Sequence, residues 1–97
     1  MSQRNPLLTQ KTGTETVTGI DTDGSGDVVV TMSELRQIDE PNDVQAQAAG
    51  GYVANVQSVS GNEVTLRIFQ GGGADTELSA ITGGSGVTDL WVHALGY

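Results

Sequence analysis

One short stretch of the chain has the residue types and spacing of an ion-binding loop: Asp21-Thr-Asp-Gly-Ser-Gly-Asp27. Side-chain oxygens at its positions 1, 3 and 5 and a glycine at position 6 match the first half of a twelve-residue calcium loop. The second half does not match, because position 12 requires a glutamate and is Met32, while Glu34 comes two residues later. The flanking segments are rich in valine and threonine and are typical of strands, whereas such a calcium loop joins two helices.

Two interpretations of this stretch stay open. In the first, its Asp, Ser and Gly residues serve the geometry of a turn in a β-hairpin, for which their side chains and backbones are well suited. In the second, Asp21, Asp23, Ser25 and Asp27 hold a calcium or sodium ion in a loop of another type. We favour the turn and predict no metal site and no cofactor, with Ca²⁺ or Na⁺ at Asp21–Asp27 as the alternative.

The other reactive residues do not form a recognisable catalytic set. His93 is the single histidine, which excludes a metal site with two imidazoles, and no G-x-S-x-G sequence supplies a serine nucleophile. We interpret His93 as a packed or interface residue of a strand. Asp39, Glu40 and Asp43 are interpreted as a solvated acidic loop, and four aromatic residues are too few for a glycosidase cleft. We therefore predict that the protein is not an enzyme and has no catalytic residues.

The charge of the chain disfavours nucleic acid as a partner. Twelve acidic residues against four basic ones give a formal net charge of -8. The basic residues Arg4, Lys11, Arg36 and Arg67 are scattered, whereas phosphate binding needs them clustered. Excess carboxylate with a single lysine fits concentrated salt, where the Debye length falls to about 3 Å and self-repulsion is screened. Ordinary acidic solubility is the alternative.

Neither export nor membrane insertion is predicted. Residues 1–6 lack the apolar region of a signal peptide, and the longest apolar runs, such as Val28–Val30, are far shorter than a membrane span. The chain has no cysteine, which excludes disulfides and thiolate metal sites. We expect a soluble chain that is made in the cytoplasm and has no membrane partner.

Alternating apolar and polar residues predict short strands from Thr14 onward. Thr14–Ile20 and Asp27–Met32 are the first two strands. Residues 33–39 fit either a helical turn or a continuing strand, and Val44–Ala49 fits either a short helix or a loop. Residues 77–82 predict a short edge strand.

The clearest element is a hairpin over Tyr52–Gln70, with Gly61-Asn62 as its two-residue turn. Its first strand falls out of phase near Gln57 or Ser58, which predicts a β-bulge there. Residues 87–95 form a last strand with apolar residues on both faces, a pattern that suits a central position in a sheet.

These elements predict an all-β protein, a small β-sandwich or Greek-key barrel of about six to eight short strands. We assign residues 14–97 to this single domain and residues 1–13 to a flexible N-terminal arm. The arm is either a disordered tail or an extended segment whose Leu7 and Leu8 dock on a neighbouring subunit. Only 36% of the residues are hydrophobic, so the core is thin and an oligomer is expected.

Residues 50–97 carry a resemblance to a group of viral proteins. The hairpin VQSVSGNEVTLRI, the glycine-rich loop after it and the C-terminal VTDLWVHALGY resemble the small all-β virion proteins of tailed viruses. The resemblance implies a decoration, turret or minor capsid protein on the surface of an icosahedral capsid, with no catalytic residues. Together with the acidic composition, it suggests a virus that infects a halophilic archaeon.

We therefore expect a structural protein of the virion, made in the host cytoplasm. Its partners are other copies of itself, with a trimer favoured, and the major capsid protein or other virion proteins. Trp91, Tyr52, Phe69 and Tyr97 are the expected anchors of the core or of an interface. The alternative function is a calcium-dependent binding or adhesion module that uses the Asp21–Asp27 loop.

Overall fold

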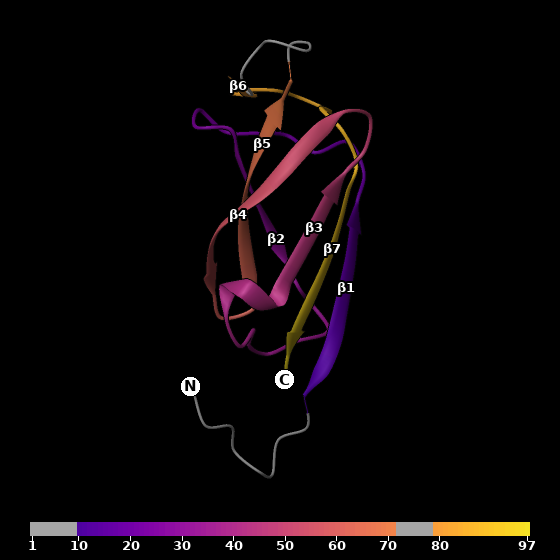
Figure 1. Ribbon diagram of the computed structural model, residues 1–97, viewed down its shortest axis with the longest axis vertical. Helices are drawn as coiled ribbons and strands as arrows, with labels where there is room; N and C mark the ends of the chain where they lie inside the picture. The colour runs from indigo at the N-terminus through magenta and orange to yellow at the C-terminus, as the bar shows by residue number, and fades with distance from the viewer. Residues whose placement is uncertain (1–9, 72–78) are drawn as a thin grey trace.

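The computed structural model describes residues 10–71 and 79–97, which fold into two antiparallel sheets (Figure 1). The elements, in chain order, are β1 (Lys11–Val17), β2 (Asp27–Thr31), the 3-10 turn η1 (Pro41–Asp43), β3 (Val44–Ala48), β4 (Tyr52–Ser60), β5 (Glu63–Gln70), β6 (Ser79–Ala80) and β7 (Leu90–Gly96). The prediction of an all-β protein is confirmed, and the architecture is that of a small β-sandwich.

Sheet A contains three strands in the order β1-β7-β3. The C-terminal strand lies at its centre, where Lys11 of β1 pairs with Gly96 and Val44 of β3 pairs with Ala94. The predicted central position of this segment is confirmed. The strand starts at Leu90 rather than at residue 87, because Val87 donates its N–H to Ile20 O in a connection between loops.

Sheet B has the order β2-β5-β4, with β6 also paired to β5. The hairpin over Tyr52–Gln70 is confirmed, and Gly61 of its turn has a φ of 60°, which glycine adopts without strain. The predicted β-bulge is confirmed between Val56 and Ser58. The predicted edge strand is confirmed at Ser79–Ala80, whereas its residues 77–78 lie outside the described part of the chain.

The inward faces of the two sheets form one hydrophobic core. Its buried side chains are Ile20, Val30, Met32, Leu35, Ile38, Val44, Val64, Leu66, Ile68, Leu90, Val92 and Ala94. Side chains of a strand alternate between its two faces, so each buried residue of β5 or β7 is followed by a residue on an outer face. The core thereby fixes which residues face solvent.

Three sequence predictions about local structure need correction. Val44–Ala48 is a strand, not a short helix or a loop, because Val44, Ala46 and Ala48 turn inward while pairing with β7. β1 starts at Lys11, so Lys11–Gly13 belong to the sheet and not to an arm; residues 1–9 of the predicted arm lie outside the described residues. Residues 33–39 form neither a helix nor a strand.

The segment 33–39 has a structural task of its own. Leu35 and Ile38 are buried, and Ile38 forms an isolated antiparallel bridge with Gly96. A side-chain carbon on Gly13 would approach Leu35 Cγ to 2.8 Å, so glycine at this position leaves room for the leucine. The segment therefore runs from the edge of β1 across one end of the sandwich, where Ile38 N–H donates to Gly61 O of the β4–β5 turn and Asp39 N–H donates to Leu95 O of β7.

Candidate functional site

The outer face of sheet A gathers an unusual set of exposed side chains. We define this A-face by the residues of β1, β7 and β3 that point away from the core: Thr12, Thr14, Thr16, Trp91, His93, Leu95, Gln45 and Gln47. Trp91 and Leu95, 38% and 37% exposed, are two of the large hydrophobic side chains that the fold leaves at the surface.

The strand register arranges the A-face in rows across the sheet. Trp91 lies between Thr16 on β1 and Gln47 on β3. His93 lies in the next row between Thr14 and Gln45. The central strand thus provides a line of aromatic, imidazole and aliphatic side chains, and hydroxyl groups and amides flank it on opposite sides.

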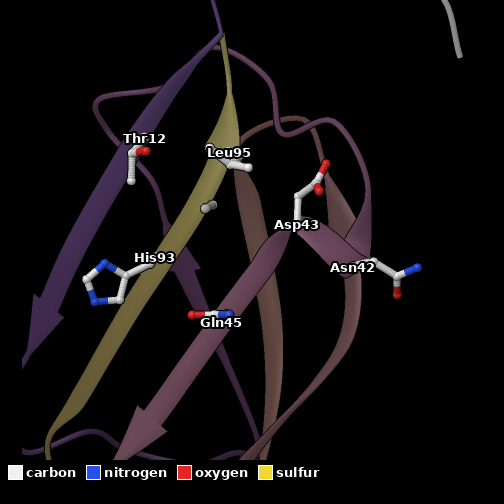
Figure 2. Close-up of a pocket in the computed structure, with 7 residues that line it drawn as sticks. Thr12, Asn42, Asp43, Gln45, His93 and Leu95 are labelled. Carbon is white, nitrogen blue, oxygen red and sulfur yellow. The ribbon is translucent and has the colours of Figure 1, made fainter.

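Two adjoining depressions, of about 270 and 500 Å³, lie over this face. The lining residues of the first are Thr12, Asn42, Asp43, Gln45, His93, Ala94 and Leu95, and those of the second are Gln45, Ala46, Gln47 and His93. Figure 2 shows Thr12 on β1, His93 and Leu95 on the central strand β7, and Gln45 on β3, with Asn42 and Asp43 where η1 leads into β3; the His93 ring points toward β1. Gln45 and His93 line both depressions and join them into one surface.

His93 is exposed on the A-face and does not pack in the core. Its Nδ1 lies 3.3 Å from Oγ1 of Thr14, and the tautomer of the ring decides which of the two donates. Among the described residues, the imidazole has no hydrogen bond to a serine hydroxyl or to a carboxylate, as a catalytic triad would require. The side chain is therefore equipped to exchange hydrogen bonds with a bound molecule.

No member of the A-face carries an ionised side chain when His93 is neutral, although the chain has a net charge of -8. The outer face of sheet B differs, because Asp27 and Arg67 form an ion pair there, with Nε 2.8 Å from Oδ1. This pair raises the pKa of the Arg67 guanidinium through the hydrogen bond and the charge of Asp27. Among the described residues, the outward positions of β1, β7 and β3 therefore hold no carboxylate.

The Asp21–Asp27 loop uses its carboxylates for the fold. Asp23 Oδ1 accepts hydrogen bonds from the N–H groups of Ser25 (2.8 Å) and Asp27 (2.9 Å), which lower the pKa of Asp23, the Asp27 bond most strongly. Asp21 Oδ1 accepts from Gly86 N–H at 2.8 Å. The two oxygens of Asp27 accept from Arg67.

The local turn geometry that we favoured for this loop is therefore present, but the expected hairpin is wrong: β1 and β2 lie in different sheets. The loop pairs instead with residues 81–88, through Thr22 N–H to Gly84 O and Gly83 N–H to Asp23 O. Across residues 10–71 and 79–97, no three His, Asp or Glu side chains gather in a group that could hold a metal ion.

The predicted anchors occupy different environments. Trp91 lies on the A-face, whereas Tyr52 packs against the edge of the core. Phe69 and Tyr97 are half-buried, and the backbone of Tyr97 is held by Arg36 N–H and Gln37 O. The sequence prediction singled out Trp91 but missed its neighbours Gln45 and Gln47. The alternation of polar and apolar residues over Val44–Ala48 could have identified this segment as a strand with both glutamines on one face.

Compared with protein-family models, curated protein sequences and solved structures, the chain matches none of them. The described residues contain no helix with the length and apolarity needed to cross a membrane.

Proposed function

We propose that the protein is a non-enzymatic structural protein of a virion, which assembles with copies of itself and with capsid proteins through the side of the sandwich formed by β3 and β4. One observation carries the proposal: the sequence from Val44 to Asn62, which includes both strands, contains no charged residue. In a chain of net charge -8, a second acidic copy can approach such a surface with little repulsion.

The two strands also offer open edges. β4 is an edge strand of sheet B and β3 is an edge strand of sheet A, and each pairs with one neighbour within the described ranges. Unpaired backbone groups of an edge strand bind another strand readily unless charge, proline or distortion prevents it. In β4 the bulge between Val56 and Ser58 distorts one part, which leaves Tyr52–Val56 as the regular part.

The edge of β1, on the opposite side of the sandwich, is less suited to pairing with another strand than the edge of β4. The N–H of Thr14 in β1 donates to Glu34 Oε1 at 3.0 Å, and Glu15 beside it accepts two hydrogen bonds from Ser33. The Glu34 carboxylate and residues 33–35 occupy the edge of β1. An added strand therefore fits β4 better than β1.

The acidic composition and the resemblance to small virion proteins support a role on the capsid surface of a virus from a salt-rich environment. We propose a trimer, because threefold contacts let each thin core gain burial from its neighbours. The major capsid protein is the proposed docking partner.

Light scattering in molar salt and in dilute buffer tests this proposal. We expect a defined oligomer in molar salt, and a monomer when Asn55→Lys places a charge on the exposed edge strand β4. Thr31→Lys is the matched control, since it adds the same charge to an exposed position of β2 on the other side of sheet B. A wild-type monomer in both buffers, or equal dissociation by the two variants, contradicts the proposal.

A further inference from the structure

The A-face combines three kinds of group that together suit a sugar. The indole of Trp91 offers a flat apolar surface for the C–H face of a sugar ring, and its ring carries the negative quadrupole face that attracts polarised C–H groups. The amides of Gln45 and Gln47 donate and accept hydrogen bonds, and the threonine hydroxyls of β1 do the same. Sugar hydroxyls need partners of both kinds. We propose that the A-face binds a neutral oligosaccharide, with Trp91 as its stacking platform.

The register places these groups where a stacked ring needs them. Gln47 and Thr16 flank Trp91 on neighbouring strands, about 4.8 Å to either side. A sugar ring lying on the indole therefore has an amide on one side and a hydroxyl on the other within hydrogen-bond reach. The next row repeats the pattern with an imidazole between a hydroxyl and an amide, which gives a second ring its own partners.

Beyond the second row, the depression that reaches Asn42 and Asp43 extends the site along the sheet. The Asp43 carboxylate is an acceptor for sugar hydroxyls, and the Asn42 amide both donates and accepts. The ligand is therefore a chain of several sugars that lies along β7, from Trp91 toward Leu95.

Charge selects a neutral ligand. The protein's net charge of -8 repels sulfated glycans, uronic acids and nucleic acid, and the A-face has no cation to attract them. A neutral glycan experiences no such repulsion. At the Trp91 and His93 rows, the absence of carboxylates also avoids the cost of removing water from a charge on binding, a cost that is confined to the Asp43 end of the site.

The size of the face favours an oligosaccharide over a second copy of the chain. Three strands about 4.8 Å apart, each contributing five residues that rise about 3.3 Å apiece, give a footprint of roughly 14 by 17 Å, or about 240 Å². A stable protein interface buries about 800 Å² on each partner. The A-face alone is about a third of that size.

Trp91 is the only tryptophan, so its fluorescence reports directly on the site. The full chain is titrated with maltohexaose, cellohexaose, mannohexaose and chitohexaose, and with heparin as an anionic probe. We expect a saturable change of emission with at least one neutral hexasaccharide and none with heparin. Gln47→Ala should weaken that binding on the order of tenfold. Thr31→Ala, an exposed change on sheet B, should leave it unaltered.

Calorimetry with the same hexasaccharide adds a test of the platform itself. Trp91→Ala should abolish measurable heat of binding while circular dichroism shows the native fold. The inference is overturned if no neutral hexasaccharide gives a saturable change, if heparin binds instead, or if Gln47→Ala and Thr31→Ala act alike. In the monomeric Asn55→Lys variant, a Trp91 emission that changes with protein concentration alone also overturns it, because the face would then bind a second copy.

This inference does not rest on the proposed assembly role, since it uses side chains on a sheet face and not the strand edges. The Asn55→Lys variant separates the two. If the variant is monomeric and still binds the hexasaccharide, the result supports both the assembly proposal and the oligosaccharide site. If the monomer no longer binds, the result contradicts the oligosaccharide site on the isolated chain and does not affect the assembly proposal.

Discussion

Strand β7 presents two faces that differ in burial although they alternate along the same seven residues. Leu90 and Val92 are fully buried and Ala94 is 2% exposed, whereas Trp91 and Leu95 are more than a third exposed. The inner face packs against sheet B, and the outer face meets solvent between a row of threonines and a row of glutamines.

The inner and outer faces of β7 place different requirements on the residues at their positions. Positions on the inner face are set by packing, because an interior at crystal-like density tolerates little change in volume. Positions on the outer face are under a weaker packing demand, and Trp91, Gln45 and Gln47 occupy three of them. Their residue types are the ones on which the proposed oligosaccharide site depends.

The two leucines of β7 give the largest expected contrast. Leu90→Ala should lower the free energy of unfolding by about 2–5 kcal/mol, because it removes packed methyl groups and leaves a cavity. Leu95→Ala makes the same chemical change on the outer face and should cost less than about 1 kcal/mol. Urea denaturation of both variants measures the difference, and equal losses would remove the distinction between the faces.

Two threonines give a similar contrast for polar groups. Thr22 is 6% exposed, donates its hydroxyl to Ile81 O and accepts from Gly84 N–H at 2.9 Å. Thr22→Val keeps the shape but leaves both backbone groups unsatisfied, at an expected cost of about 1–3 kcal/mol. Thr16→Val on the A-face should change stability by no more than about 0.5 kcal/mol.

Thermal unfolding of both valine variants tests this expectation, and hydrogen exchange of the Gly84 amide adds a local readout. Faster exchange in Thr22→Val but not in Thr16→Val is expected. A Thr22→Val protein as stable as the wild type would mean that water replaces the lost hydroxyl and that the loop pairing does not depend on it.

The parts of the fold that the sequence predicted are those with strong local signals. The turn Gly61-Asn62 and the alternation of Val64, Leu66 and Ile68 identify a hairpin without knowledge of any distant residue. The bulge followed from the same logic, because a phase change between Val56 and Val59 requires an extra residue.

The parts that it missed depend on distant partners. Ala and Gln favour helices, so the five residues of β3 gave no clear local preference, and pairing with β7 decided the outcome. The Asp21–Asp27 loop was expected in a hairpin because its true partner, residues 81–88, lies about sixty positions later in the chain.

The candidate site shows the same limit. Trp91 and His93 stood out as single residues of their types, but their rows with Gln47 and Gln45 exist only once β3 lies beside β7. A surface assembled from three strands that are distant in sequence leaves no motif at any one place in the chain.

The smallest expected effect concerns Glu15, which shares β1 with three A-face threonines but has the opposite orientation. Hydrogen bonds to its Oε1 from Ser33 Oγ (2.6 Å) and Ser33 N–H (2.9 Å), the hydroxyl bond most strongly, lower the pKa of Glu15 below its ordinary value of 4.5. The unfolded chain therefore takes up a proton at higher pH than the folded one. The resulting stability is fully present above pH 4.5 and is lost as the pH falls through the lowered pKa.

Glu15→Gln should thus unfold with a weaker dependence on pH below about 4.5 than the wild type, and Asp23 should account for part of the dependence that is left. Thermal unfolding across this pH range measures it, with Glu63→Gln on the outer face of sheet B as the control for loss of one charge. Glu15 holds the 33–39 segment against the edge of β1, so its effect should appear in stability and not in hexasaccharide binding, which the threonines on either side of it serve. An altered binding affinity in Glu15→Gln with an unaltered pH dependence would reverse this assignment and would place Glu15 in the binding surface.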